Sequence, residues 1–337
     1  MTSSKRIGFR VDGSSDLGLG HVMRCLALAD SLNSWKSSFW IKENSTVRSL
    51  LEGRSVRYLS SDIDKAVEHD LLAQEMKFVS IDFFVVDFLR YPEGYLDAFK
   101  KKGFFLITFH EFERECPFSD MVINYNSFQD FESVKEGGRE CLGPKYVILR
   151  EGIRRYQRRE PANDMSKVLV SMGGSDPNGI SFEVLSALAG LKENLRIVLH
   201  IGPAFKHRKR FNELAAFPKV IIVDNVTELA DLMIEADLAI AAGGNTMYEL
   251  CYLGVPSLII AQNDHQLEFA KGLAKVGAVK SLGLHSQVSK GEIVDAVRNF
   301  LGDYGLRKKM SKRGREIVDG KGCERIVKKI MNAVGPI

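Results

Sequence analysis

Residues 7–32 read IGFRVDGSSDLGLGHVMRCLALADSL and combine a short apolar run, a glycine-containing turn and an amphipathic segment. The run Ile7–Val11 has the length and unbroken hydrophobicity of a strand buried on both faces, and VMRCLALADSL has the apolar spacing of a helix. Gly18 and Gly20 allow the backbone to turn tightly and to approach a ligand closely. A strand, a glycine turn and a helix in this order predict the first part of a βαβ unit.

The same alternation continues along the whole chain. Further apolar runs predict strands at Phe39–Ile41, Val56–Leu59, Phe83–Asp87, Phe104–Phe109, Met121–Asn124, Val168–Met172, Ile197–Ile201, Val220–Val223, Leu238–Ala242 and Ser257–Ala261. Segments with helical apolar spacing separate most of these runs, which is typical of parallel sheets. We therefore predict an α/β protein.

The alternation stops between residues 150 and 167, where the sequence REGIRRYQRREPANDMSK is polar and rich in arginine. This stretch predicts a linker. It divides the chain into a Rossmann-like domain at residues 1–155 and a second Rossmann-like domain at residues 156–337. Open parallel sheets bind ligands at the carboxyl ends of their strands, so we expect the two domains to face a cleft that holds the active site.

The composition is that of an ordinary globular protein. The 337 residues are 27% charged and 45% hydrophobic, with a net charge of +4. These values exclude disordered, collagen-like and disulfide-scaffold proteins. The five cysteines are dispersed and form no CxxC pair, which suits a reducing compartment. No signal-peptide pattern and no apolar run of the roughly 18–20 residues that a membrane span needs is found, so we expect a cytoplasmic protein with no integral membrane association.

Basic residues gather near the carboxyl end, where residues 307–329 contain ten Lys or Arg against three Asp or Glu. A membrane-surface or nucleic-acid role is one interpretation of this excess. The apolar residues between the charges keep a helical spacing, and no aromatic residue interleaves them. We therefore interpret the segment as the solvated faces of two terminal helices and expect no nucleic-acid partner.

His21 is the sharpest candidate for chemistry in the first domain. It stands at the expected start of the first helix, where the positive end of the helix dipole opposes formation of the imidazolium ion. A neutral ring can accept a proton, as a general base must. Spacing alone leaves a purely structural, hydrogen-bonding histidine as the alternative.

A second glycine turn follows the run Val168–Met172 and consists of Gly173 and Gly174 followed by Ser175 and Asp176. Backbone amides in such a turn, beside a helix cap, can form an anion-binding nest. The alternative interpretation is an Asp176 helix cap with Pro at the first helical position.

A third glycine turn follows Leu238–Ala242. Gly244 permits close approach of a ligand, and Asn245 or Thr246 can cap a helix whose free N–H groups face a diphosphate. Glu249 stands one turn later, where a carboxylate can accept hydrogen bonds from the vicinal hydroxyls of a ribose. Together these residues favour a nucleotide site over an ordinary capped helix.

A polar cluster follows Ser257–Ala261 and contains His265 and Gln266. Its place after a parallel strand predicts a position at the rim of the cleft. Helix capping by Asn263 or Asp264 explains part of the cluster without a function.

Several known motifs are absent. The chain has no GxxxxGK[ST], no GxSxG and no HExxH, which removes the main support for P-loop, α/β-hydrolase and zincin functions. Helix capping explains Asp62 and Asp64, the single DxD pair, better than magnesium binding does. We expect neither a metal nor an organic cofactor.

Taken together, these segments resemble the hydrolases of pseudaminic acid biosynthesis, which remove UDP from UDP-2,4-diacetamido-2,4,6-trideoxy-β-L-altropyranose. The matching pieces span most of the chain and are RVDGSSDLGLGHVMRCLALA, LGPKYVILREGI, SMGGSDPNG, AAGGNTMYELCYLGVP and IVDGKGCERIV. In the first piece Asp12, Gly18, Gly20, His21 and Arg24 all stand in register. This family is similar to two-domain, GT-B-like nucleotide-sugar glycosyltransferases, including the transferase that makes lipid II.

The resemblance implies an inverting hydrolysis at the anomeric carbon. It implies that His21 deprotonates the attacking water and that the second domain holds UDP. The site residues predicted from the motifs and the resemblance together are His21 as the catalytic base and, for substrate binding, Asp12, Gly18, Gly20, Arg24, Asp87, Gly173, Gly174, Ser175, Asp176, Gly244, Asn245, Thr246, Glu249, His265 and Gln266.

The departures from the family lie where the sugar is expected. Family members usually carry an Asp-His-Tyr-like run where this chain has Asp87 and Phe88, and a pair of aspartates where it has His110 and Glu111. An Asn-Gln pair of the family is His-Gln at residues 265–266. The identity and stereochemistry of the sugar therefore stay open.

The sequence thus predicts a monomeric, inverting UDP-sugar hydrolase that releases a free amino sugar for nonulosonate biosynthesis. One alternative is a glycosyltransferase in which an acceptor hydroxyl replaces the water at His21. The other is a nucleotide-sugar-binding homologue that has lost catalysis through the changes at His110 and Glu111.

Overall fold

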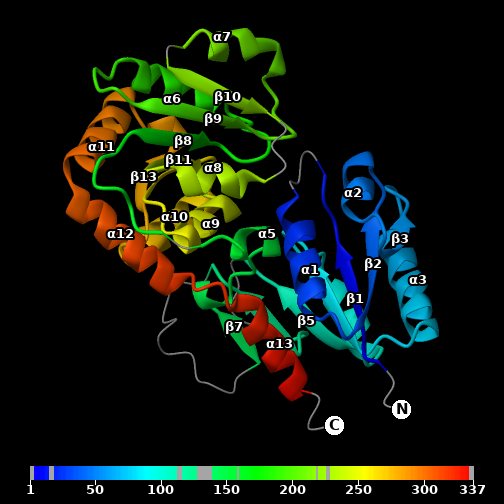
Figure 1. Cartoon of the computed structure of the whole chain (residues 1–337). Helices are drawn as coiled ribbons and strands as arrows, with labels where there is room; N and C mark the ends of the chain where they lie inside the picture. Colours follow the sequence, from blue (N-terminus) through cyan, green and yellow to red (C-terminus); the bar gives the residue numbers. More distant parts are fainter. Residues whose placement is uncertain are drawn as a thin grey trace. The chain divides into compact units, whose positions relative to one another are not determined.

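Two parallel β-sheets organise the chain, as the ribbon in Figure 1 shows. The computed structural model describes residues 4–14, 19–111, 116–126, 139–157, 159–217, 219–224 and 228–333. The chain divides into two units, of which the first comprises Met1–Arg150 with Lys321–Ile337 and the second comprises Glu151–Gly320. Each unit has a parallel sheet with helices packed on it, which confirms the predicted α/β class.

Among its described residues, the first unit has a seven-stranded sheet in the order β3-β2-β1-β4-β5-β6-β7, and all neighbouring strands are parallel. The strands are β1 (Arg6–Val11), β2 (Lys36–Lys42), β3 (Ser55–Leu59), β4 (Phe83–Asp87), β5 (Phe105–Phe109), β6 (Met121–Asn124) and β7 (Glu140–Leu142). The helices are α1 (Gly20–Ser31), α2 (Ser45–Leu50), α3 (Lys65–Phe78), α4 (Tyr95–Lys101), the 3-10 turn η1 (Pro144–Tyr146) and α13 (Gly322–Ala333). Every residue of β4 is buried, which explains its continuous apolar run.

The described part of the second unit has a six-stranded sheet in the order β10-β9-β8-β11-β12-β13, again with parallel neighbours throughout. Its strands are β8 (Lys167–Ser171), β9 (Arg196–Ile201), β10 (Val220–Asp224), β11 (Leu238–Ala242), β12 (Ser257–Ala261) and β13 (Lys280–Leu284). Its helices are α5 (Glu151–Arg154), α6 (Ile180–Ala189), η2 (Arg208–Arg210), α7 (Phe211–Ala215), α8 (Leu229–Glu235), α9 (Asn245–Leu253), α10 (Asp264–Lys275), η3 (His285–Gln287), α11 (Lys290–Gly302) and α12 (Tyr304–Ile317). Apolar residues of β8, β9, β11 and β12 form a core with α6 and α11.

The strand order reverses at the first strand of each sheet. β1 lies between β2 and β4, and β8 lies between β9 and β11. Ligands of open parallel sheets bind at the carboxyl ends of the strands beside such a reversal. The carboxyl end of β1 and the glycine turns that follow β8 and β11 therefore stand at the expected position for ligand binding in their respective units.

All the strands predicted from apolar runs are present, with ends that shift by a few residues at most. The sequence missed β7 and β13, which are edge strands of the two sheets. β7 has only three residues, and four of the five residues of β13 are partly exposed, with Gly283 interrupting its side chains. Neither strand needs the continuous apolar run by which a central strand is recognised.

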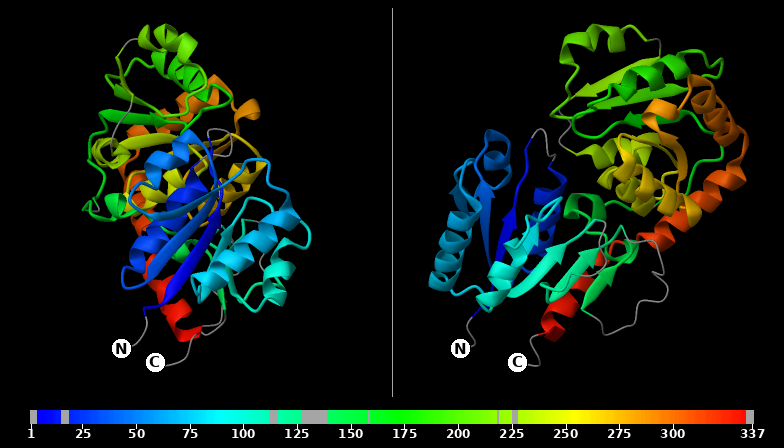
Figure 2. Two further views of the ribbon diagram at one scale, coloured as in Figure 1. Left: turned by 90° about the vertical axis from the view of Figure 1, so that its right-hand side faces the viewer. Right: turned by 180° about the vertical axis from the view of Figure 1, so that it is seen from behind.

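The helix α13 belongs to the first unit, whereas the sequence predicted it to lie in a second domain of residues 156–337. The buried side chains of Cys323, Ile326 and Ile330 form its apolar face. The helix packs against α1 and η1, and Lys329 Nζ donates a hydrogen bond of 2.8 Å to Glu140 O in β7. Figure 2 shows this red helix alongside the strands of the first unit. The first boundary between the two units falls between residues 150 and 151, whereas the predicted domain boundary falls between residues 155 and 156.

Several basic residues of the last helices bind backbone carbonyls, although the sequence predicted that they lie on solvated faces. Arg307 is completely buried and donates to the carbonyls of Phe300 and Leu301 at the end of α11, and to those of Ala162 and Asn163. Other residues of this segment also bind backbone carbonyls, namely Arg313 (to Val276), Arg315 (to Arg159), Arg325 (to Lys145) and Lys329. Much of the local charge thus stabilises the fold.

None of the helices in the described ranges contains an apolar stretch long enough to cross a membrane.

Candidate active site

His21, Arg24 and Asp87 form one hydrogen-bonded cluster in the first unit. His21 is the second residue of α1, and Arg24 follows one turn later on the same face of the helix. Asp87 ends β4, which pairs with β1 so that Val11 lies opposite Asp87. His21 Nδ1 lies 2.7 Å from Asp87 Oδ1, while Arg24 Nε and Nη2 each donate to an Asp87 oxygen at 2.6 Å. The sheet thus brings together groups that are 66 positions apart in the sequence.

The contacts of Nδ1 select one tautomer of His21. An ionised carboxylate can only accept a hydrogen bond, so Nδ1 carries the hydrogen and donates it to Asp87. Arg24 Nη2 also lies 2.8 Å from Nδ1, but an Nδ1 that carries a hydrogen cannot accept from it, and Nη2 donates one of its two hydrogens to Asp87 Oδ1. In the neutral form of His21, Nε2 then keeps its lone pair, and no described residue donates to it. A neutral imidazole oriented by a carboxylate in this way can act as a general base.

Asp87 is enclosed by protein, and its side chain is 0% exposed. Burial by itself opposes the ionised form, but the guanidinium charge of Arg24 and the hydrogen bonds from Arg24 and His21 outweigh it and hold the pKa of Asp87 well below its usual range. The sequence predicted that Asp87 binds substrate. In the structure its contacts are with His21, Arg24 and Cys25, so any effect on a substrate passes through its neighbours.

Two further side chains accept hydrogen bonds from Nη1, the other terminal nitrogen of Arg24. Nη1 donates to Tyr125 Oη at 2.7 Å and to Glu111 Oε1 at 3.3 Å. Arg24 is buried, with its guanidinium 4.8 Å from the ring centroid of Phe109. The side chains of Glu111 and His21 are 15% and 14% exposed, so both reach the surface while Arg24 and Asp87 lie beneath them. The sequence did not indicate Tyr125, and it marked Glu111 only as a departure from the family where the sugar is expected, although Glu111 follows β5 at the expected edge of the sheet.

The other expected residues of this unit have structural contacts or fall outside the described ranges. Asp12 Oδ1 accepts hydrogen bonds from Arg10 Nη1 at 2.6 Å and from Lys42 N at 3.0 Å, so it connects the ends of β1 and β2. Gly20 is the first residue of α1. Gly18 lies outside the described residues.

Two residues at which the sequence departs from the related hydrolases point into the fold. Phe88 packs over the guanidinium of Arg10 at 4.8 Å and against Tyr95. His110 is buried, stacks near Tyr91 and shares a hydrogen bond of 3.0 Å with Thr108 Oγ1. Of the pair at residues 110 and 111, only Glu111 therefore contacts Arg24.

In the second unit, the turn after β8 holds its own carboxylate at the start of α6. The two oxygens of Asp176 accept hydrogen bonds from Ile180 N at 2.9 Å and Ser181 N at 3.0 Å. The N-cap residue of α6 is Gly179 and the helix begins at Ile180, so Asp176 is not the N-cap and Pro177 is not the first helical residue, although the Asp176 carboxylate still binds the first two amides of the helix. Because Asp176 occupies these amides, an anion at this turn would have to use other groups of the turn.

Gly173 and Gly174 have open space where side chains would be. A Cβ atom at either position meets no heavy atom within 4 Å. The loop after β9 forms two backbone hydrogen bonds with this turn. Ala204 N donates to Gly174 O at 2.9 Å, and Lys206 N donates to Ser175 O at 3.0 Å. The approach is so close that a Cβ on Gly202 would lie 2.5 Å from Gly174 Cα.

The turn after β11 leads into α9 through Gly244, which is the N-cap and provides no side-chain hydrogen bond. Neither Asn245 nor Thr246 is therefore the N-cap residue that the sequence suggested. A Cβ on Gly244 would also meet open space. Asn245 is exposed, Thr246 is partly exposed and Glu249 is buried one turn later. The turn thus presents a helix N-terminus beside open space, as the binding of a phosphate group requires.

Gln266 connects the turns that follow β11 and β12. Its Oε1 accepts hydrogen bonds from Gly243 N and Gln262 N, both at 3.1 Å. Asn263 caps α10 by accepting from Gln266 N at 3.0 Å, as the sequence suggested. His265 lies in the first turn of α10. The structure thus places Gln266 as a support of the glycine turn, a role that its sequence position did not indicate.

A buried pair that the sequence did not single out lies at the same edge of the second sheet. Ser171 Oγ and His200 Nδ1 are 3.0 Å apart, at the ends of β8 and β9. Burial lowers the pKa of His200 to about 4, against a smaller opposing effect of Asp224. His200 is therefore a neutral hydrogen-bonding residue near pH 7.

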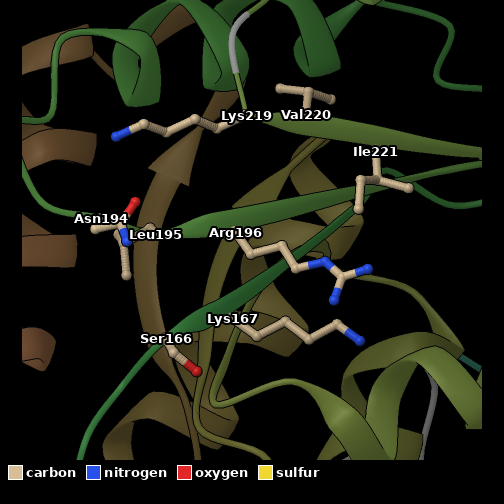
Figure 3. A pocket seen from close by; sticks show the side chains of 8 residues that line it. All are labelled: Ser166, Lys167, Asn194, Leu195, Arg196, Lys219, Val220 and Ile221. Atoms are coloured by element: carbon tan, nitrogen blue, oxygen red, sulfur yellow. The ribbon is translucent and has the colours of Figure 1, made fainter.

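A surface pocket of the second unit lies away from all these turns. Figure 3 shows its lining, which includes Ser166, Lys167, Arg196 and Lys219. These residues stand at or just before the amino ends of β8, β9 and β10, opposite the glycine turns. Lys167 is already paired with Glu235. The pocket therefore does not belong to the site built by the turns.

Comparison with known proteins agrees with this architecture. Residues 168–316 match the family described as the glycosyltransferase family 28 C-terminal domain. The chain is 28% identical to the spore coat polysaccharide biosynthesis protein SpsG of Bacillus subtilis, over 95% of this chain and 96% of that protein.

A more distant relative is the Helicobacter pylori protein named pseudaminic acid cytidylyltransferase and UDP-2,4-diacetamido-2,4,6-trideoxy-beta-L-altropyranose hydrolase. It is 23% identical over 84% of this chain, which spans 49% of that protein. Among solved structures, MurG of Acinetobacter baumannii superimposes with a TM-score of 0.75 at 17% identity, covering 97% of this chain and 99% of that one. The chain therefore has the two-domain fold of GT-B glycosyltransferases, and its second unit resembles the family 28 C-terminal domain.

Proposed function

We propose that this protein is an inverting UDP-sugar hydrolase that releases UDP and a free amino sugar for nonulosonate biosynthesis of the pseudaminic acid type. The observation that carries the proposal is the His21–Asp87 pair, in which Nδ1 is bound and Nε2 is available to a ligand. The H. pylori relative, whose name includes a UDP-sugar hydrolase, supports the choice of reaction.

In this proposal His21 accepts a proton from water while the water oxygen attacks the anomeric carbon. The new C–O bond forms from a lone pair of the water oxygen. The bond between the anomeric carbon and the phosphate oxygen breaks, and its electron pair leaves with UDP. His21 carries the proton on Nε2 as an imidazolium ion, which Asp87 stabilises through Nδ1, and then returns it to solvent.

The nucleotide is assigned to the second unit. The open space at Gly174 and Gly244 lets phosphate oxygens approach backbone amides, and the uncapped start of α9 favours the negative charge. Glu249 is proposed to contact the ribose hydroxyls, as acidic residues do in dinucleotide sites. Amides at a helix start can also stabilise the charge that develops on the departing UDP.

The test is UDP release from purified protein incubated with UDP-2,4-diacetamido-2,4,6-trideoxy-β-L-altropyranose or UDP-N-acetylglucosamine, with no acceptor added. We expect release, and a His21→Ala variant should lower the rate about 10²–10⁴-fold. His285→Ala, in η3 of the second unit, is the matched histidine control. Release that requires an added acceptor would identify a transferase, and UDP binding without turnover would identify a binding protein.

The transferase is the second candidate because residues 168–316 match a glycosyltransferase family and the fold matches MurG. In that case an acceptor hydroxyl replaces water at His21. The cluster around His21 serves either nucleophile as a base, so the choice between them depends on what else contacts the nucleophile.

A further inference from the structure

Glu111 and His21 are each close to one of the two terminal nitrogens of the Arg24 guanidinium. Arg24 Nη2 is 2.8 Å from His21 Nδ1, and Nη1 is 3.3 Å from Glu111 Oε1. Asp87 binds both His21 and this planar guanidinium, so the side chains of His21 and Glu111 lie close together. Both side chains are partly exposed, whereas Arg24 itself is buried. The structure therefore presents a base and a carboxylate side by side at the surface of the first unit.

The second carboxylate oxygen of Glu111 is available for another partner. Oε1 makes the contact with Arg24, and no hydrogen bond to Oε2 is found among the described residues. The guanidinium of Arg24 already gives two hydrogen bonds to Asp87 and one to Tyr125. Its contact with Glu111 is the longest of the set, so this carboxylate is the least committed acceptor of the cluster.

Water and an alcohol differ in the number of hydrogens that must be placed. A water molecule has two O–H bonds, of which a general base takes one. The remaining O–H needs an acceptor if a lone pair of the oxygen is to point steadily at the anomeric carbon. An acceptor hydroxyl has only one O–H, which the base removes. A second acceptor beside the base therefore assists hydrolysis more than glycosyl transfer.

We propose that Glu111 is a second catalytic residue, which accepts the remaining O–H of the attacking water while His21 takes the other hydrogen. This proposal rests on the proposed hydrolase function and explains why water is the preferred nucleophile. Glu111 orients the water, and no proton is transferred to it. In the balanced step, one proton goes to His21, the new hydroxyl stays on the anomeric carbon, and UDP leaves with the electron pair of the broken bond.

The test is a competition between water and methanol in one reaction. Native protein and Glu111→Ala are each incubated with whichever UDP-sugar of the two above is turned over, in buffer containing methanol. The free sugar and the methyl glycoside are then quantified in the same sample. Their ratio does not depend on how much of a variant is folded, so a partly unfolded variant remains informative.

We expect Glu111→Ala to lower kcat for hydrolysis about 10-fold or more, with KM within about twofold, and to raise the share of methyl glycoside by a similar factor. Glu111→Gln keeps a carbonyl acceptor and should recover part of the hydrolysis. Tyr125→Phe removes the other acceptor on Arg24 Nη1 and should leave the product ratio unchanged. The exposed Glu52→Ala is the control for the loss of a surface carboxylate.

Three results would overturn the proposal. If Glu111→Ala raises KM with kcat unchanged, Glu111 binds the sugar. If hydrolysis and methanolysis fall by the same factor, or if neither changes, Glu111 does not orient the water. These results differ from failure of the hydrolase function, in which native protein releases no UDP from either sugar without an acceptor and both proposals fall.

Discussion

Arg24 binds Asp87 through two parallel hydrogen bonds, from Nε to Oδ2 and from Nη2 to Oδ1, each 2.6 Å long. Both side chains are almost completely buried, so the charge of each depends on the other. The same carboxylate binds His21, and the same guanidinium contacts Glu111. One buried ion pair therefore fixes the positions of both partly exposed side chains.

Replacing Asp87 by Asn should destabilise the first unit by about 3–5 kcal/mol, because the buried Arg24 would lose its nearest counterion and keep only Glu111 at 3.3 Å. Both tryptophans, Trp35 and Trp40, lie in this unit, so tryptophan fluorescence during urea unfolding reports on it alone. Asp70→Asn, at an exposed pair with Lys102, is the control and should change little.

The Asp87 pair also predicts a pH dependence. Because the pKa of Asp87 is lowered in the folded state, its contribution is fully present above the ordinary aspartate value of about 3.9 and is lost only as pH falls through the lower folded value. The stability difference between native protein and Asp87→Asn should therefore persist down to about pH 4. A difference that disappears between pH 6 and 5 would contradict this.

Alanine at Gly174 or Gly244 should weaken UDP binding without loss of stability. The added methyl group would enter open space, so the fold can accommodate it, but it would stand where the proposed phosphate lies. Gly173 is unsuitable for this test because its φ of +78° strains any other residue. Calorimetric titration with UDP should show at least about a tenfold loss of affinity, which corresponds to 1.4 kcal/mol. Gly302→Ala, at the end of α11, is the control, and equal affinities would remove the nucleotide from these turns.

Alanine at Gly202 should disturb the turn of Gly173 and Gly174 by a steric clash with its backbone. Its Cβ would lie 2.5 Å from backbone atoms of Gly173 and Gly174, so the turn or the loop must move, at a cost of about 1–3 kcal/mol. Hydrogen exchange of the peptides covering β8 and β9 should accelerate, and UDP affinity should fall as well. Gly190→Ala, whose Cβ has only an ordinary contact of 3.7 Å, is the comparison, and matching exchange in both variants would refute the steric argument.

His200 should make the second unit sensitive to moderate acid. Its folded pKa of about 4 lies below the ordinary value of 6.5, so the unfolded chain binds the extra proton first. Stability is fully present above pH 6.5 and is lost as pH falls toward 4, by about 3 kcal/mol in total. His200→Gln keeps a hydrogen-bonding group for Ser171 but does not titrate. Hydrogen exchange of β8 and β9 between pH 7 and 4.5 should show a smaller loss of stability in the variant, once the intrinsic pH effect on exchange is corrected.

Arg307→Met should destabilise the second unit by about 3 kcal/mol. The substitution keeps much of the buried volume but leaves the carbonyls of Phe300 and Asn163 without their charged donor. Lys309→Met, an exposed position on the same helix, is the control. Thermal unfolding followed by circular dichroism measures both, and an unchanged transition in Arg307→Met would mean that the four hydrogen bonds contribute nothing net.

The sequence predicted the central strands and the glycine turns because both depend on local patterns. Fully buried strands need continuous apolar runs, and tight turns need glycine. Local patterns could not predict the groups around His21, because Asp87 ends β4 and Glu111 follows β5. Only the order of the strands in the sheet brings the carboxyl ends of β4 and β5 together. Asp87 was recognised as a site residue, but its complete burial beneath His21 depends on packing. Asp176 illustrates the same limit, because one carboxylate can bind a ligand or cap its own helix.

The division of the chain has a consequence for its synthesis. The first unit needs residues from both ends of the sequence, and the whole second unit lies between them. On the ribosome, β1 to β7 emerge before the second unit, whereas α13, which buries Ile326 and Ile330 in their unit, emerges after it. Domains generally fold as units during synthesis. The apolar surface that α13 covers therefore stays uncovered until the second unit has been made.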